Sequence, residues 1–524
     1  NPRLGYPAPT NVTDFIAFRI NELQLVDAAG GQADVQAAKA RGLVQGFDPL
    51  DSYVRWIKNN GKGNARIPID FDRIRRYFAD KMVVVDEMHG AGRDYLTRLI
   101  GEAGVRFTVI HAEVDPDLGG QDYANPEEPF NQLLKDTVVK TGAHLGMGMD
   151  TDADRFGIVD RDGTYFRPNQ ILPMLVRYLG VDRGLTGRII ATQTGSPLLE
   201  PLAGMIPGNE ANWPVEGALP GYVNQVAYKC QVGDIHTRAL RYAFAVPVGI
   251  KYIEEIRRTD RAYNALKELP DNWRDTILIG GEESSGLTTR GHVLDKDGPW
   301  ANILIMDMVA YYGTREENPL HSLKEIWDEL VSLPGLWESF GTSTDPSSHA
   351  GRADVDAPLE AKEGFINYYL DLAQNTGVKN PKIAGLTVDY LGGIRYELVE
   401  MQLIDDDGDD HHYLRMRASG TEPINRIYIE SSQLETGQKM MKEVLKRLEL
   451  ITMDVLVKAH SPWHLVDMLT QTTMTADTLA LVKQLIGERG WDKQDILAKI
   501  QQMLQTLEKR NRKVITTWYE ALRK

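Results

Sequence analysis

Three carboxylates and one guanidinium crowd into the centre of segment 146–160, GMGMDTDADRFGIVD. Asp150, Asp152 and Asp154 stand at every second position, and Arg155 follows at once. Two like charges about 4 Å apart repel by roughly 4 kcal/mol at an effective dielectric constant of about 20. Three neighbouring carboxylates are therefore tolerated where they point into water or where a cation binds them. Because carboxylate oxygens suit Mg²⁺ or Ca²⁺, the spacing favours a divalent metal site.

Other interpretations of this acidic segment can be weighed from the sequence. An EF-hand needs Gly at the sixth loop position and Glu at the twelfth, which here are Arg155 and Arg161, so it is excluded. A phosphatase of the haloacid-dehalogenase type, with an Asp nucleophile after an apolar strand, stays open. So does a simple acidic surface turn.

Three more segments carry residues that could bind a sugar or a phosphate. GGEESSG (280–286) sets carboxylates and hydroxyls among glycines, a composition suited to sugar hydroxyls, although a polar turn would look similar. RASGTEP (417–423) combines an arginine with hydroxyls and a glycine turn, which together can bind an anion; a capping turn is the alternative. VPVGIKY (246–252) presents Lys251 after a Pro-Gly turn. Taken alone, this segment is weak evidence for a binding site, because a surface lysine would look the same.

Another acidic segment resembles a metal site in composition but has a simpler interpretation. DDDGDDHH (405–412) lies between alternating apolar runs. Asp-Gly in that setting is turn chemistry. We therefore expect an acidic hairpin turn there.

Apolar runs predict the elements that position these segments. HLGMGM and FGIV on either side of the acidic triplet indicate two short buried strands. Strand-like and helix-like runs alternate along the chain, which predicts α/β domains with mostly parallel sheets. Ligands in such sheets gather at the carboxyl ends of the strands. The runs predict strands at 82–90, 105–111, 187–195 and 276–286, and helices at 12–28, 93–104 and 129–142.

Two segments differ from the rest of the chain in composition and hydrophobic periodicity. Residues 338–364 are polar and irregular, and we expect a linker there. Residues 451–524 have long helical periodicity with only two glycines, and they predict a helical extension that could serve oligomerisation or docking.

Composition excludes several classes of protein. The 524 residues contain 42% hydrophobic and 25% charged residues, as in an ordinary globular protein, and the length is enough for three or four domains. A net charge of −15 argues against a general nucleic-acid binder. Cys230 is the only cysteine, which favours a reducing compartment, and we expect a cytoplasmic location. No apolar stretch reaches membrane-spanning length and no signal peptide is seen, so no membrane association is expected.

Taken together and in this order, the acidic, GGEESSG and RASGTEP segments resemble the α-D-phosphohexomutase family of phosphoglucomutases, phosphomannomutases and relatives. The family's metal loop is typically DGDADR; here it is DTDADR, with Thr151 in place of Gly and all three ligands kept. The sugar loop GEESxG and the phosphate loop RxSGTEP are matched as well. The resemblance covers roughly residues 1–445 and also includes VPVGIKYI, GHVLDKDG (291–298), MHGAG (88–92) and PAPTNVTD (7–14).

The resemblance implies a fold of several mixed-sheet α/β domains followed by a smaller C-terminal α+β domain and then the helical extension. The expected domains are a remnant of a phosphoserine domain, a metal-loop domain, a sugar-binding domain, a phosphate-binding domain and the extension. Their expected bounds are 1–60, 61–185, 186–335, 336–450 and 451–524.

The resemblance also implies an activity. Family members transfer a phosphoryl group between the 1 and 6 positions of a hexose through a bisphosphorylated sugar, with a phosphoserine as donor. It implies Mg²⁺ as the metal, glucose 1,6-bisphosphate as activator and a phosphorylated hexose, with glucose favoured over mannose, as substrate. By residue, it implies metal ligands Asp150, Asp152 and Asp154; catalytic residues Arg155 and Lys251; sugar-binding residues Glu282 and Ser284; and phosphate-binding residues Arg417, Ser419, Gly420 and Thr421.

One family feature is missing from this sequence. The serine loop of the family reads like TASHNP, whereas this chain begins with Asn1 and Pro2 and soon reaches PAPTNVTD. Ser196 and the Ser348-His349 pair lie in the wrong parts of the family pattern and are treated as decoys. We therefore expect most of the first domain, with the phosphate-carrying serine, to be absent. A catalytically inactive sugar-phosphate-binding protein is the alternative, and an Asp-nucleophile phosphatase, which would leave the other two loops unexplained, is a weaker one.

Overall fold

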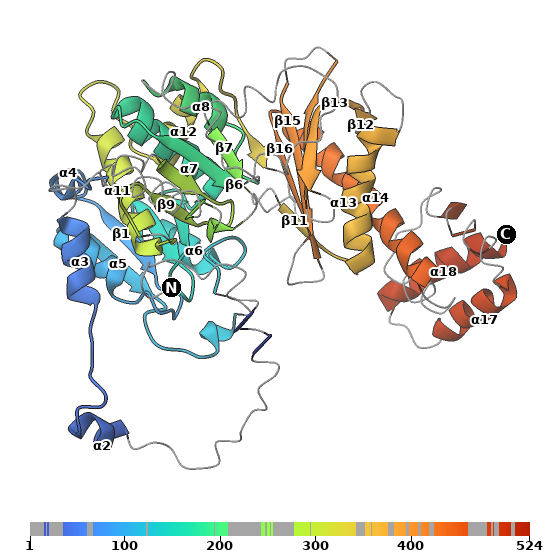
Figure 1. The fold of residues 1–524 in the computed structure, drawn as a ribbon, viewed down its shortest axis with the longest axis horizontal. Coiled ribbons are helices and arrows are strands. Elements are labelled where there is room, and N and C mark those ends of the chain that lie inside the picture. The colour runs from blue at the N-terminus through green and yellow to red at the C-terminus, as the bar shows by residue number, and fades with distance from the viewer. Residues whose placement is uncertain are drawn as a thin grey trace. The chain divides into compact units, whose positions relative to one another are not determined.

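A computed structural model gives the fold (Figure 1). Its described residues are 15–19, 35–59, 67–207, 243–254, 277–341, 352–375, 382–418, 424–459 and 479–524, with gaps at 17, 122–123, 193, 247–248, 252, 294, 358, 395–397, 407–409, 481, 484–485, 487–491 and 505–508. Most of the helix predicted at 12–28 lies outside them. The chain divides into two compact units, with residues 1–217 and 236–338 in the first and 218–235 and 339–524 in the second. The fivefold domain division stays a prediction.

The first sheet of unit 1 carries the acidic triplet. Its strand order is β2-β1-β3-β4-β5, parallel across β2, β1 and β3 and antiparallel across β3, β4 and β5. Continuous apolar runs form its central strands because both faces of β3 and β4 are buried. The predicted strands at 82–90 and 105–111 are confirmed as β1 and β2. The strands are β1 (Met82–Asp86), β2 (Arg106–Ile110), β3 (Leu145–Met149), β4 (Phe156–Asp160) and β5 (Tyr165–Phe166).

The second sheet of unit 1 carries the GGEESSG segment. Its order is β7-β6-β8-β9, with β7, β6 and β8 parallel and β9 antiparallel to β8. The strands predicted at 187–195 and 276–286 are therefore confirmed, and both sheets of this unit are mixed. The strands are β6 (Arg188–Thr192), β7 (Ala243–Val246), β8 (Ile277–Gly281) and β9 (Leu287–Thr289).

Helices pack on these sheets, and α11 (Gly298–Gly313) has the largest number of buried residues among the described ones. The Asp297 carboxylate caps its first turn by accepting from Trp300 N, and Pro299 lies in that turn, as at many helix starts. The helices predicted at 93–104 and 129–142 are confirmed as α5 and α6. The others of unit 1 are α2 (Val35–Ala40), α3 (Leu50–Lys58), α4 (Phe71–Tyr77), α5 (Tyr95–Glu102), η1 (Leu118–Gly120), α6 (Gln132–Thr141), α7 (Pro168–Val176), η2 (Arg177–Asp182), α8 (Leu199–Met205) and α12 (Leu323–Val331).

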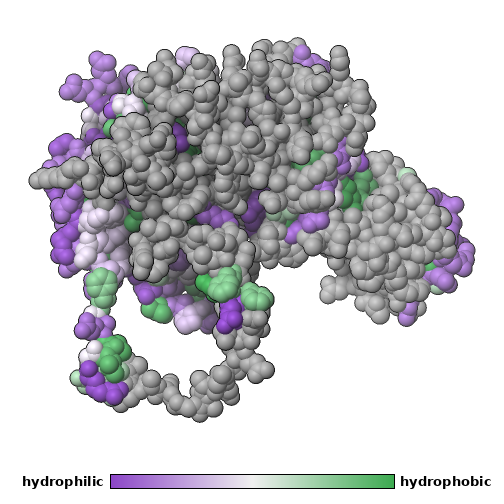
Figure 2. Space-filling model, in the orientation of Figure 1, coloured by the Kyte–Doolittle hydropathy of each residue, from purple (hydrophilic) through white to green (hydrophobic). Residues whose placement is uncertain are grey.

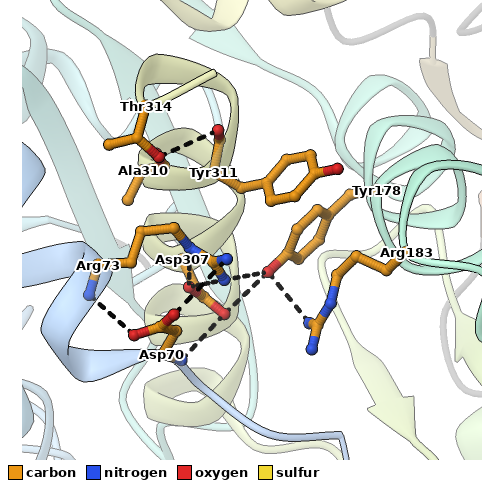
Figure 3. A network of polar contacts seen from close by, with 8 residues as sticks. All are labelled: Asp70, Arg73, Tyr178, Arg183, Asp307, Ala310, Tyr311 and Thr314. Atoms are coloured by element: carbon orange, nitrogen blue, oxygen red, sulfur yellow. Dashed lines mark hydrogen bonds and ion pairs between the residues drawn. The ribbon is translucent and has the colours of Figure 1, made fainter. Parts of the chain in front are cut away.

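One buried carboxylate on the apolar helix α11 joins three helices (Figure 3). Asp307 is fully buried and accepts from Arg73 Nη2 at 2.7 Å and from the Tyr178 hydroxyl at 2.9 Å. Asp70 N donates to it at 3.3 Å, and Arg183 Nη1 donates to the Tyr178 hydroxyl at 3.1 Å. Because a buried charge is costly unless it is paired, this network fixes α4 and η2 against α11.

Unit 2 is built on an antiparallel sheet with helices α13 and α14 on one side (Figure 1). The hairpin of β14 and β15 places the DDDGDDHH segment at its turn, as predicted, although residues 407–409 lie outside the described part. Buried residues of both helices and of strands β13 to β16 form one core. The strands are β10 (Phe340–Gly341), β11 (Arg352–Asp356), β12 (Lys382–Ile383), β13 (Leu386–Ile394), β14 (Leu398–Ile404), β15 (His412–Ala418) and β16 (Ile424–Ser431).

The predicted linker at 338–364 is wrong in part. It contains β11, which pairs antiparallel with β16, and the start of α13 (Leu359–Asn375). In β11 Ala353 is buried and Val355 is half-buried against the core, while Asp354 and Asp356 are exposed, so the strand alternates but over only a few residues. The sequence of β11 alone predicts a strand only weakly, and its pairing with β16 stabilises it.

The described helices after the sheet agree with the predicted extension. They are α14 (Leu434–Ala459), which runs across the expected boundary at 450, α17 (Lys493–Met503) and α18 (Lys509–Arg523). Among the described residues, no helix is both long and apolar enough to cross a membrane. Near the other end of the chain, Leu43, Val44 and Phe47 are exposed between α2 and α3, where Figure 2 shows hydrophobic surface.

Candidate functional site

The acidic triplet lies in the turn between the antiparallel strands β3 and β4, in which Met149 pairs with Phe156. One carboxylate oxygen from each of Asp150, Asp152 and Asp154 lies within 4.8 Å of the others. Asp150 is buried, Asp154 is half-buried and Asp152 is exposed. The cluster is therefore buried on the side of Asp150 and exposed to solvent on the side of Asp152.

Backbone hydrogen bonds fix the shape of this turn. Asp150 Oδ1 accepts from the amides of Asp154 and Arg155, at 3.1 Å each, and Arg155 Nε lies 3.3 Å from Asp150 Oδ2. The positive φ of the turn falls on Ala153 (60°). Thr151 is not among the residues with positive φ, so replacing the family's glycine by threonine creates no left-handed strain.

The electrostatics of the cluster favour a cation. Burial raises the pKa of Asp150 to about 7, and the negative charges of Asp154 and Asp152 contribute to this rise. Asp154 Oδ1 is buried and has no hydrogen-bond partner among the described residues. Three carboxylates with one such oxygen form a donor set that fits Mg²⁺.

Glycines let neighbouring loops pack directly on the acidic turn. Ala91 N donates to Thr151 O at 2.6 Å, and a Cβ on Gly90 would lie 2.9 Å from Asp150 O. A Cβ on Gly298 would lie 2.4 Å from Arg155 O. The MHGAG and GHVLDKDG segments therefore support the acidic turn through close backbone contact.

The GGEESSG segment forms the connection between β8 and β9 and packs on the same turn. Phe156 N donates to Ser285 O at 3.0 Å, and Glu282 N donates to Gly286 O at 2.8 Å. Glu282 is buried, and this burial raises the pKa of its carboxyl to about 7 although Lys296 opposes the shift. A second glutamate, Glu283, accepts from the Thr192 hydroxyl at 2.9 Å and from Thr194. Glu282 is thus held beside the acidic turn.

Lys296 connects the acidic turn with Glu282, and sequence reasoning missed it. Its Nζ lies 2.9 Å from Asp154 Oδ2 and 3.7 Å from Glu282 Oε2. The side chain is only 13% exposed. Lys296 lies within GHVLDKDG, a segment that resembles the family, and this position could have identified it as a candidate.

A histidine pair at the carboxyl ends of β1 and β2 was missed as well. His111 Nδ1 lies 2.8 Å from Asp86 Oδ1, a contact that raises the pKa of His111. The rings of His89 and His111 are 4.7 Å apart. MHGAG signalled His89, whereas nothing in the sequence marked His111.

The remaining candidate residues differ in burial and belong to both units. Lys251 is exposed and Ser284 half-buried in unit 1, and Arg417 is half-buried in β15 of unit 2. Ser419, Gly420 and Thr421 lie outside the described residues, as does the Ser348-His349 pair. Ser196 is buried, and its Oγ accepts from Leu198 N at 3.3 Å.

Comparison with known families matches two parts of the chain. Residues 51–163 match the phosphoglucomutase/phosphomannomutase alpha/beta/alpha domain II, and residues 224–331 match domain III of the same family. The acidic turn lies in the first match, and the GGEESSG segment and Lys296 lie in the second.

Individual relatives agree with this match at low identity. A phosphoglucomutase/phosphomannomutase of Thermococcus kodakarensis is 26% identical over 416 residues, covering 77% of this chain and 68% of the relative. A phosphoglucomutase of Komagataeibacter xylinus is 24% identical over 444 residues, covering 82% and 66%. The chain thus spans about two thirds of the length of these curated relatives.

Solved structures support the fold. A protein described as a phosphomannomutase from Thermus thermophilus superimposes with a TM-score of 0.50 at 20% identity, covering 77% of this chain and 66% of that one. The parafusin phosphoglucomutase of Paramecium gives 0.50 at 18% identity, covering 78% and 63%. These likenesses show the fold, and the two matched domains and the curated relatives are all those of the phosphohexomutase family, which they support for this chain.

Proposed function

We propose that this protein binds a hexose phosphate with Mg²⁺ and takes part in phosphoryl transfer between the 1 and 6 positions of the sugar. One observation carries the proposal: three loops from two sheets meet through Lys296, which joins a carboxylate of the acidic turn to Glu282. Phosphoryl transfer depends mainly on charge neutralisation and alignment. A carboxylate cluster, a buried cation and a buried acceptor for hydroxyls supply these.

In this proposal Asp150, Asp152 and Asp154 would hold Mg²⁺, which would supply positive charge to neutralise the phosphoryl group. Asp150 acts as a ligand, and the backbone of the turn and Arg155 hold its carboxylate in place. The phosphatase alternative is weaker because it leaves the GGEESSG and RASGTEP segments without a role. Arg155 offsets the charge of the triplet and binds the transferring group.

The sugar is bound by the GGEESSG segment. Glu282 accepts hydrogen bonds from its hydroxyls, and Ser284 accepts or donates them. Lys296 binds the reacting oxygen or phosphate next to Glu282, since a lysine ammonium has three donors and can leave Asp154 for a substrate anion. Lys251 assists at the reacting hydroxyl.

The phosphate that does not react is bound by the RASGTEP segment. Arg417 supplies a guanidinium, and Ser419, Gly420 and Thr421 supply hydroxyl and backbone donors. The support for these four residues is their match to the family sequence.

The hexose is proposed to be glucose, with glucose 1,6-bisphosphate as intermediate and activator. The phosphoserine that carries the phosphoryl group in the family is not assigned to a residue of this chain. A cytoplasmic location is supported by the single cysteine. Oligomerisation or docking through residues 451–524 stays a prediction.

A mutase assay tests the proposal. The 524-residue chain is given glucose 1-phosphate, Mg²⁺ and a trace of glucose 1,6-bisphosphate, and glucose 6-phosphate is measured. Turnover that depends on Asp152 supports a mutase. Binding of the phosphosugar without turnover is the result expected of the acceptor part of a mutase without its serine, and it agrees equally with the non-catalytic alternative. Absence of both binding and turnover contradicts the proposal.

A further inference from the structure

The segment that carries Lys296 is closed on itself by a side-chain contact. His292 Nε2 lies 2.9 Å from Asp297 Oδ2, so the two ends of segment 292–297 are joined. The His292 side chain is fully buried. Lys296 is the residue next to Asp297, so its backbone position depends on where this carboxylate is held.

The Asp297 carboxylate is engaged on both oxygens. Oδ1 accepts from the Tyr53 hydroxyl at 2.7 Å and from Trp300 N at 2.9 Å, while Oδ2 faces His292. Burial and the nearby Asp297 charge raise the pKa of Tyr53 well above its ordinary value, so this hydroxyl stays protonated and donates at neutral pH. Tyr53 thus links α3 to the first turn of α11.

Aromatic packing makes this link rigid. His292 stacks on Trp300 with ring centroids 4.5 Å apart and an angle of 16°, and the ring of Trp56 in α3 lies 4.8 Å from the His292 ring. Trp300 Nε1 donates to Thr289 Oγ1 at 3.0 Å. Two residues of α3, Tyr53 and Trp56, therefore pack on the segment that carries Lys296.

The other side of this segment meets the candidate site. Gly298 N donates to Ala153 O at 2.9 Å, and Lys296 reaches Asp154 and Glu282. A shift of Asp297 would therefore move the lysine relative to both carboxylates.

We propose that Tyr53 is a positioning residue of the hexose-phosphate site, which acts through Asp297 to place Lys296 between Asp154 and Glu282. The role of the site rests on the proposed function; the placement of Lys296 by Tyr53 does not. Helix α3, which contributes no residue to the acidic turn, is thereby part of the machinery of the site.

The test uses Tyr53→Phe, which removes one hydroxyl and keeps the ring. Two readouts are measured on the full chain: the Kd for glucose 1-phosphate with Mg²⁺, by calorimetry, and the rate at which Lys296 is acetylated by an N-hydroxysuccinimide ester, by peptide mass spectrometry. We expect Kd to rise about tenfold, the equivalent of one hydrogen bond to a charged group, and Lys296 to be acetylated faster.

Two further variants separate positioning from general packing. Tyr95→Phe is the matched control, because the Tyr95 ring packs edge-on against the Tyr53 ring at 5.3 Å, whereas the hydroxyl that donates to Asp297 belongs to Tyr53; both readouts should stay at their wild-type values. In a Lys296→Met background, Tyr53→Phe should have little further effect on Kd, since it acts through the lysine.

The outcomes separate this inference from the proposed function. If wild-type protein does not bind the phosphosugar, the proposed function fails while the acetylation rates still test the inference. Equal acetylation of Lys296 in wild type and Tyr53→Phe, or an undiminished effect of Tyr53→Phe in the Lys296→Met background, overturns the inference. Should Tyr53→Phe fail to fold, His292→Leu removes another partner of Asp297 and carries the same comparison.

Discussion

Lys296 Nζ lies 2.9 Å from Asp154 Oδ2, so an ammonium group already occupies one side of the carboxylate cluster. A cation bound by the cluster must share Asp154 with this lysine. The ion pair therefore links the metal-binding and sugar-binding parts of the candidate site, and it predicts opposite effects on two ligands.

Replacing Lys296 by Met should tighten Mg²⁺ binding about tenfold, because a competing positive charge is removed. The same change should weaken phosphosugar binding, because the buried cation beside Glu282 is lost. Both are measured by calorimetry. Lys324→Met, which breaks an exposed pair with Asp328, should alter neither, and equal effects of the two variants would refute the link.

Replacing Asp152 by Ala should abolish the Mg²⁺ dependence of phosphosugar binding, because one of three ligands is removed. Asp152 is exposed, so the fold should keep its stability. Asp136→Ala, another exposed aspartate, is the control. Unchanged Mg²⁺ dependence in Asp152→Ala would rule out the metal assignment.

Mg²⁺ binding should depend on pH around neutrality. The pKa of Asp150 in the folded protein is about 7, and the ion needs the carboxylate. Affinity should therefore fall as pH drops below about 7 and level off above it, with proton uptake by Asp150 opposing the ion. Calorimetry in buffers of different ionisation enthalpy measures the proton release; its absence at about pH 6 would contradict this pKa-based prediction.

In metal-free protein, a rise in pH should lower the stability of the fold through Asp150, whereas it raises the affinity for Mg²⁺. Because the pKa of Asp150 is raised above its unfolded value, its contribution to stability is fully present below about pH 4 and decreases as pH rises towards 7.

Replacing Gly298 by Ala should disrupt the acidic turn, because the new Cβ would lie 2.4 Å from Arg155 O and 2.7 Å from Ala153 O. Mg²⁺ binding should weaken at least tenfold. Gly101→Ala in α5 meets nothing within 4 Å and should be neutral or stabilise the protein by about 0.5–1 kcal/mol. Metal titration and thermal unfolding of both variants provide the comparison, and wild-type Mg²⁺ affinity in Gly298→Ala would show that the close approach is unimportant.

Replacing Arg73 by Met should destabilise the protein by about 3–5 kcal/mol, because Asp307 would be left buried without its charge partner. The double variant Arg73→Met/Asp307→Leu should recover much of this loss. Urea unfolding measures both free energies. A double variant no more stable than Arg73→Met would mean that packing, and not the unpaired charge, causes the loss.

Local patterns were enough to predict the acidic cluster and eight elements of unit 1, namely strands β1 to β4, β6 and β8 and helices α5 and α6. MVVVD and FGIVD are continuous apolar runs, and the three aspartates are close in sequence, so spacing alone brings their oxygens together. Lys296 could not be placed in this way, because its contacts with Asp154 and Glu282 depend on the packing of separate loops.

Strand β11 was missed for a related reason, since pairing with β16 and not its own composition stabilises it. The role of Asp307 depends on Arg73 and Tyr178, which are distant from it in the sequence. In both cases the deciding partner is distant in sequence, so no local pattern could reveal it.

Calorimetric titration of the 524-residue chain with glucose 1-phosphate, with and without Mg²⁺, tests the central claim most directly. We expect saturable one-site binding that strengthens with Mg²⁺ and loses this dependence in Asp152→Ala. Binding that ignores Mg²⁺, or no binding under either condition, would contradict the claim.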